Sequence, residues 1–138
     1  MRLAAARDTI AAEYTRGFPV TFDLALDALR RARRQGLDLL RAVAQAHLAV
    51  MARVPDTLIR RKAGETEATR VATRARAVMR AGGLATSKGI AAARRLDAEL
   101  RRDGNRRNPG TSADLVAAAL FVWLLEQPDH PRSPGRSR

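Results

Sequence analysis

Residues 105–115, with the sequence NRRNPGTSADL, hold the densest group of side chains that could bind an anion. Asn, Pro and Gly at positions 108–110 are turn-forming types, and an apolar helical pattern follows them. Thr111 and Asp114, three residues apart, form a variant of the capping box in which Asp replaces Glu. The spacing therefore predicts a turn and then a helix that begins near Thr111.

Two arginines precede this turn. The first N–H groups of a helix carry the positive end of its dipole and point back along the chain, where Arg106 and Arg107 lie. A helix N-terminus beside two guanidinium groups is a sound site for a phosphate. An ordinary loop and helix cap uses the same residue types, so the residues alone leave both interpretations open.

Residues 55–64, PDTLIRRKAG, form a second candidate segment. Asp56 offers a carboxylate of the kind that binds Mg²⁺, and the three basic residues at 60–62 could donate to phosphates. The alternative is structural: Asp56 caps a short helical turn and the basic side chains are solvated.

Other polar groups carry weaker signals. Arg7, Asp8, Glu13 and Tyr14 are interpreted as surface contacts of the first helix, and His47 as a core or boundary residue without a second ligand at metal-binding spacing. The sequence has no HExxH motif, nucleophile elbow, Walker loop or GxGxxG motif, and the glycines at 82–83 are interpreted as a helix stop.

The charge of the chain favours polyanionic partners. It has 26 Lys plus Arg against 14 Asp plus Glu, for a formal net charge of +12, and only Lys62 and Lys88 are lysines. Arginine suits bidentate phosphate binding, although a codon bias toward arginine and alanine explains such a composition equally well. Without cysteine there is no disulfide, thiolate nucleophile or cysteine metal site, and without a long apolar run we expect a soluble, cytoplasmic protein.

Helical spacing recurs along the chain, with no convincing strand pattern. We therefore predict an all-α bundle of about six helices as one domain over residues 1–127, with a disordered tail at 128–138 that is rich in Pro, Gly and Ser. The helices are expected at residues 3–14, 19–35, 37–53, 65–80, 88–102 and 111–126. The predicted inward face of the third consists of Leu40, Val43, Ala44, His47, Leu48 and Met51, and that of the sixth of Leu115, Ala119, Val122 and Leu125.

Taken in order, three segments resemble the triphosphoribosyl-dephospho-CoA synthase family. They are ARDTIAAEY at residues 6–14, PDTLIRRKAG at 55–64 and NRRNPGTSADLVAAALFVWLL at 105–125, supported by VMRAGG at 78–83 and LDAELR at 96–101. The resemblance implies a transferase that moves a triphosphoribosyl unit from ATP to 3'-dephospho-CoA and releases adenine. The product is the precursor of the acyl-carrier prosthetic group of citrate lyase or malonate decarboxylase.

The resemblance also implies a set of site residues. Asp56 and Asp114 are expected to be catalytic, to hold Mg²⁺ and to face a common polar cleft. The expected substrate-binding residues are Arg61, Lys62, Arg106, Arg107, Asn108, Gly110, Thr111 and Ser112. ATP is expected as a substrate, with Mg²⁺ as its companion.

The resemblance covers only the C-terminal half of the family's usual length. A separately encoded N-terminal half or a homo-oligomer is therefore an expected partner, and an isolated chain should expose apolar surface. Two alternatives stay open: a small basic helical protein that binds nucleic acid, and a catalytically silent fragment. The spread of arginines over several helices and the absence of a stacking or helix-turn-helix pattern disfavour nucleic acid, and no membrane association is expected.

Overall fold

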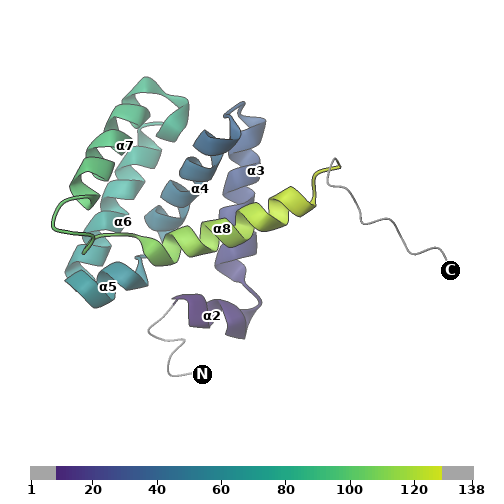
Figure 1. Ribbon diagram of the computed structural model, residues 1–138. Coiled ribbons are helices and arrows are strands. Elements are labelled where there is room, and N and C mark those ends of the chain that lie inside the picture. Colours follow the sequence, from purple (N-terminus) through teal and green to yellow (C-terminus); the bar gives the residue numbers. More distant parts are fainter. Residues whose placement is uncertain (1–8, 129–138) are drawn as a thin grey trace.

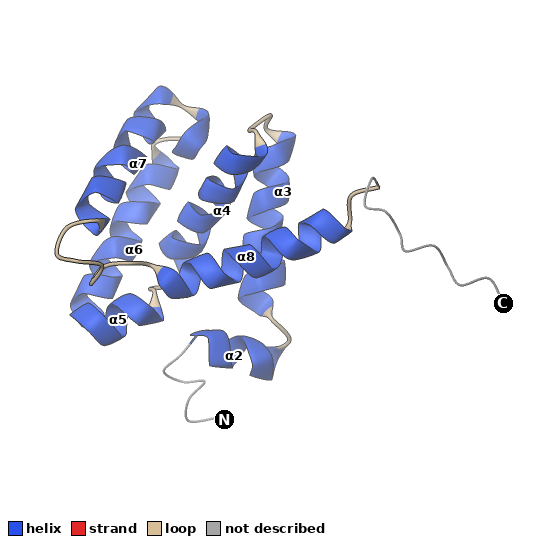
Figure 2. Cartoon of the chain, in the orientation of Figure 1, coloured by secondary structure: helices blue, strands red, loops and turns tan. Residues whose placement is uncertain are grey.

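The computed structural model describes residues 9–128, and this part of the chain is built from helices, with no strand among them (Figures 1 and 2). The prediction of an all-α fold is confirmed. The elements are α2 (Thr9–Arg16), the π-helix η1 (Val20–Leu26), α3 (Asp27–Arg34), α4 (Leu39–Arg53), α5 (Thr57–Ala63), α6 (Glu65–Arg80), the 3₁₀ turn η2 (Gly83–Ala85), α7 (Ser87–Leu100) and α8 (Gly110–Leu125). The predicted tail lies, apart from Pro128, outside the described residues. No helix in the range 9–128 is both long and apolar enough to cross a membrane.

Helix α4 lies between the two hydrophobic clusters of the core. One cluster joins it to η1, α3 and α8, and the other joins it to α5, α6 and α7. Ala42 and Ala46 on α4 are completely buried, and such small side chains let neighbouring helices approach closely. Figure 1 shows the result: α4 stands between α3 and α6, and α8 crosses in front of the bundle.

The inward face predicted for the third helix is wrong in part. Leu40 is 83 % exposed, while Ala42, Gln45 and Ala46 are buried. Gln45 tolerates burial because its Oε1 accepts a hydrogen bond from the N–H of Leu84 at 2.8 Å, which ties α4 to η2. The face expected to point inward instead borders a cleft, described below, since apolar periodicity cannot tell a packed face from the wall of a cleft.

Glu13 is also corrected, from a surface residue to a buried one. It is 1 % exposed, and its two carboxylate oxygens accept hydrogen bonds from the N–H groups of Val20 and Thr21, both at 2.8 Å. The carboxylate thus satisfies the first orphan donors of η1 from a neighbouring helix. Tyr14 is 65 % exposed, as expected, whereas residues 1–8 lie outside the described residues.

The end of α8 carries exposed apolar side chains. Leu115 and Ala119 are buried as predicted, but Leu125, assigned to the same inner face, is 53 % exposed. Phe121 is 63 % exposed on the same helix. The first turns of α8 therefore pack closely against the bundle, while its last turns pack on one side, through Val122 and Trp123, and expose the other.

Candidate functional site

The carboxylate of Asp56 connects the N-termini of two helices. Its Oδ1 accepts hydrogen bonds from the N–H groups of Leu58 and Ile59 at the start of α5, at 2.8 and 3.1 Å. Its Oδ2 accepts from both the N–H and the hydroxyl of Ser112 on α8, at 2.7 and 2.8 Å. Asp56 is only 4 % exposed. It therefore caps α5 and binds the N-terminus of α8 with the same buried group.

Two threonines and a glycine complete this junction between α5 and α8. The hydroxyls of Thr57 and Thr111 form a buried hydrogen bond at 3.0 Å. Gly110 lies against the side chain of Leu58: a Cβ at this position would be 2.7 Å from Cδ2 of Leu58, so that side chain would have to move. Thr57 and Thr111 are 54 positions apart in the chain, and Asp56 and Ser112 are 56 apart, so the junction joins two distant segments.

The capping box predicted for α8 is not formed. Pro109 occupies the N-cap position without a side-chain cap, and Thr111 already lies within the helix. Asp114 is exposed on α8. The anion at the helix N-terminus is Asp56 of the same chain, so a residue distant in sequence performs the role that local spacing assigned to Thr111.

This geometry also bears on magnesium. All four hydrogen bonds of Asp56 come from groups inside the protein, and its oxygens are turned toward α5 and α8. Asp56 thus does not fit a Mg²⁺ site, and we interpret it as a residue that positions the two helices.

The predicted basic residues separate into two groups. Arg106 donates to the carbonyl oxygen of Lys62 at 3.3 Å, which places it over the exposed side of α5, where Arg61 also lies. Arg107 is half-buried and pairs with Glu67 at 2.7 Å and with Asp103 at 3.2 Å. Adjacent arginines thus point to different parts of the surface, and Arg106 contacts the C-terminal end of α5, away from the α5–α8 junction.

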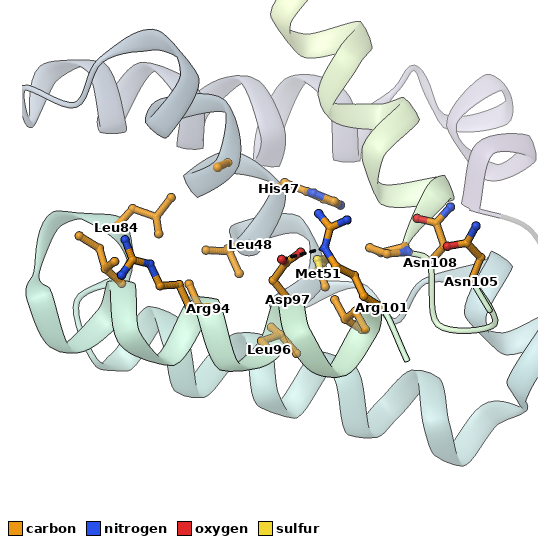
Figure 3. Close-up of a pocket in the computed structure, with 15 residues that line it drawn as sticks. His47, Leu48, Met51, Leu84, Arg94, Leu96, Asp97, Arg101, Asn105 and Asn108 are labelled. Carbon is orange, nitrogen blue, oxygen red and sulfur yellow. Dashed lines mark hydrogen bonds and ion pairs between the residues drawn. The ribbon is translucent and has the colours of Figure 1, made fainter. Parts of the chain in front are cut away.

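A cleft of ≈650 Å³ opens between α4 and α7, beside the junction (Figure 3). Asn108, the one predicted site residue on its wall, comes from the loop before α8. Neither Asp56 nor Asp114 borders it. The apolar wall residues are Ala44, Leu48, Met51, Leu84, Ile90, Ala93, Leu96, Leu100 and Pro109, and the polar ones are His47, Arg94, Asp97, Arg101, Asn105 and Asn108.

His47 lies where the cleft meets the junction. Its Nε2 is buried and makes no hydrogen bond within the described part of the chain. Desolvation lowers the pKa of its imidazole, an effect that the backbone carbonyl of Pro109 and the negative charge of Asp56 oppose only in part. The imidazole is therefore neutral at pH 7 and has a nitrogen lone pair that can accept a proton.

Four polar residues of the cleft were not among the predicted site residues: Arg94, Asp97, Arg101 and Asn105. Asp97 accepts a hydrogen bond from Nε of Arg101 at 2.8 Å, and the pair faces the same cleft as His47 (Figure 3). The spacing of i, i+3 and i+7 from Arg94 to Arg101 places three charges on one face of α7. That charged stripe could have indicated a site on this helix, but an ordinary solvent-exposed helix face has the same pattern.

The comparisons with known proteins agree with the resemblance of the motifs. The model of the ATP:dephospho-CoA triphosphoribosyl transferase family matches residues 1–133. A probable 2-(5''-triphosphoribosyl)-3'-dephosphocoenzyme-A synthase of Pseudomonas fluorescens is 38 % identical over 117 residues. A protein of the same description from Stutzerimonas stutzeri is 39 % identical over 106 residues. No solved structure matches the chain significantly.

These alignments cover 85 % and 77 % of this chain but only 40 % and 36 % of the two relatives, so the chain spans well under half of their length. The family match extends from the first residue through α8. It includes the α5–α8 junction, the cleft and the loop between them. The chain belongs to the ATP:dephospho-CoA triphosphoribosyl transferase family.

Proposed function

We propose that this chain is a nucleotide-binding part of a triphosphoribosyl transferase that uses ATP and 3'-dephospho-CoA and releases adenine. The observation that carries this proposal is the family match over residues 1–133. The product would be the precursor of an acyl-carrier prosthetic group, and we place the protein in the cytoplasm, where both substrates occur. A second copy of the chain, or a separately encoded segment equivalent to the rest of the relatives, is the partner we propose.

The cleft between α4 and α7 is the site that we propose for the nucleoside part of a substrate. Its volume of ≈650 Å³ is within the usual range for small-molecule sites. Apolar side chains from both helices offer surface to an adenine ring, and His47, Asn105 and Asn108 supply hydrogen-bonding groups at the end near α8. The nearby Arg101 supplies a cation for a phosphate.

His47 is the base that we propose for the transfer step. The new bond joins the 2'-oxygen of dephospho-CoA to the anomeric carbon of ATP, and the bond from that carbon to adenine breaks. The 2'-hydroxyl proton passes to the imidazole, and adenine takes up one proton as it leaves as a neutral base. The proton that His47 then releases balances the one that adenine gains, so the histidine ends neutral as it began. A neutral histidine at the cleft wall suits this role, because a base must begin unprotonated. Its free Nε2 is buried in this structure, so the imidazole must turn toward the cleft before it can reach the 2'-hydroxyl.

The two motif segments would support this site in different ways. Asp56, Thr111 and Ser112 hold the α5–α8 junction and, through Pro109, the end of the cleft. At the exposed C-terminal end of α5, Arg61, Lys62 and Arg106 are proposed to bind phosphate groups. Asp114, exposed in the first turns of α8, is proposed to contact the substrate from that helix.

Calorimetric titration of the chain with ATP tests the proposal without requiring turnover. We expect saturable binding that Ala44→Phe weakens about tenfold or more, because the added ring occupies part of the cleft. Ala91→Phe is the matched control, since Ala91 is exposed on α7 and does not border the cleft. Titrations with and without Mg²⁺ show whether binding needs the ion. Equal affinities of the two variants would exclude the cleft as the nucleotide site.

Asp114→Asn separates a functional from a structural role of this carboxylate. Because Asp114 is exposed and caps no helix, we expect the melting temperature to stay within roughly 2 °C of wild type. In a complete protein that carries these segments, adenine release from ATP in the presence of dephospho-CoA should fall about a hundredfold, because a neutral amide replaces a charged group at the site. Near-normal adenine release from the variant would remove Asp114 from the proposed site.

A further inference from the structure

A second hollow, of ≈550 Å³, lies against α7 and is lined almost entirely by charged side chains. It is formed by α6, α7 and the loop before α8. Its lining residues are Arg70, Arg74, Arg95, Ala98, Glu99, Arg102 and Arg107. We refer to it as the arginine hollow.

The arginine hollow is separate from the cleft between α4 and α7. Successive residues of a helix point about 100° apart, so neighbours in sequence face different directions. Arg95 of α7 and Arg102, just after its end, line the hollow, whereas Arg94 and Arg101, each one residue earlier, line the cleft. Helix α7 therefore presents a charged face to each of two sites, and the two share no lining residue.

Three of the guanidinium groups in the hollow are held in place by carboxylates. Glu99, whose side chain is 15 % exposed, pairs with Arg70 at 2.7 Å and also with Arg74. Glu67 pairs with Arg70 and with Arg107, each at 2.7 Å. The hydrogen bond from Arg70 and the two nearby guanidinium charges lower the pKa of Glu67, so its carboxylate stays ionised at neutral pH. These contacts fix the orientation of donors that would otherwise lose rotamer freedom on binding a ligand.

The other two arginines are not part of this network. Arg95 and Arg102 are exposed, and neither forms an ion pair with a carboxylate in residues 9–128. Even counting Glu67 and Asp103 at its edge, the hollow has five guanidinium groups for three carboxylates. Two positive charges therefore remain beside three pre-oriented donors.

We propose that the arginine hollow binds a chain of linked phosphates. Guanidinium groups bind phosphate oxygens in a bidentate manner, and converging arginines suit several adjacent phosphates better than a single one. No aromatic side chain lines the hollow, so it lacks a platform on which nucleic acid bases could stack. A compact polyphosphate therefore matches the site better than a nucleic acid strand.

Titration with inorganic tripolyphosphate tests this site directly. We expect Arg95→Ala/Arg102→Ala to weaken binding about tenfold or more, because two charge-assisted hydrogen-bonding groups are lost. Arg53→Ala/Arg80→Ala is the control, because both arginines are exposed and lie outside the hollow. Their substitution removes the same net charge as Arg95→Ala/Arg102→Ala. The control should change the affinity less than about twofold. Equal losses in the two double variants would show a diffuse charge effect and overturn the proposal.

Further arms of the experiment identify the source of the phosphates. If ATP displaces tripolyphosphate and loses affinity in Arg95→Ala/Arg102→Ala, the ligand is the phosphate chain of a nucleotide. If ATP does not compete, the ligand is a free polyphosphate, and either result supports the site. An oligonucleotide that binds more tightly than tripolyphosphate, and depends more on the two arginines, would overturn the proposal in favour of a nucleic acid surface.

The proposal does not require the α4–α7 cleft to be the nucleotide site. Ala44→Phe alters the α4–α7 cleft and lies outside the arginine hollow, so it should leave the affinity for tripolyphosphate unchanged. Titrations of Ala44→Phe therefore test the cleft, and titrations of Arg95→Ala/Arg102→Ala test the arginine hollow, so each proposal can be rejected without the other.

Discussion

Asp56→Ala is expected to lower the free energy of unfolding by about 3 kcal/mol, equivalent to a fall of roughly 10 °C in the melting temperature. The substitution removes one buried carboxylate and leaves three backbone N–H groups, those of Leu58, Ile59 and Ser112, without their acceptor. Both α5 and α8 lose the negative charge at their N-termini. Urea denaturation followed by circular dichroism measures the change.

Asp38→Ala is the matched control for this experiment. Asp38 also caps a helix, accepting a hydrogen bond from the N–H of Arg41 at 2.9 Å, but its side chain is 63 % exposed. It caps α4 alone, so its loss should cost about 1 kcal/mol or less. If the two variants lose the same stability, Asp56 acts as an ordinary N-cap and does not lock the junction.

His47→Gln is expected to reduce adenine release about a hundredfold while changing the affinity for ATP by less than about threefold. Glutamine keeps hydrogen-bonding groups at the cleft wall but cannot accept a proton at neutral pH. The measurement is adenine release from ATP in the presence of dephospho-CoA, beside calorimetric titration of the same variant. A hundredfold loss of affinity would instead assign His47 to substrate binding.

The chain supplies its own control for His47. His130 is the only other histidine and lies beyond α8, so His130→Gln should leave adenine release unchanged. NMR of the imidazole groups adds a readout that does not depend on turnover. Addition of ATP should shift the signals of the histidine that His47→Gln removes, and leave those of His130 in place.

The pH dependence of the reaction follows from the lowered pKa of His47. Because only the neutral imidazole is a base, adenine release should rise with pH through this lowered pKa and be level above about 6.5, the ordinary value for histidine. His47→Gln should abolish the acidic limb of this profile. A limb of unchanged shape in the variant would show that another group titrates.

The sequence alone determined the fold class and the family. Glycines on either side of residues 65–80 and good helix formers between them predicted a helix with the bounds that α6 has. Such signals are local: turn residues, caps and a 3.6-residue period act within a few positions along the chain. The three motif segments, read in order, predicted the family, and the match of the family model to residues 1–133 confirms it.

Only the tertiary structure decided which of the polar residues are available to a ligand. Local spacing made Asp56 a candidate metal ligand, but Ser112, 56 positions away, donates two hydrogen bonds to its carboxylate. Adjacent Arg106 and Arg107 look equivalent in the sequence, yet Glu67 and Asp103 bind the second of them. A buried or paired charge is defined by partners from distant segments, so it becomes visible only when the helices pack.

His47 is a second residue whose surroundings the sequence could not show. On an isolated helix it belongs to an apolar stripe, and the sequence therefore predicted a core or boundary histidine. The role that we propose for it arises because α7 leaves a cleft in front of that stripe, and because Pro109 and Asp56 approach it from the α5–α8 junction. The period of a helix determines which residues share a face, whereas the packing of its neighbours determines whether that face is filled with protein or left open to a substrate.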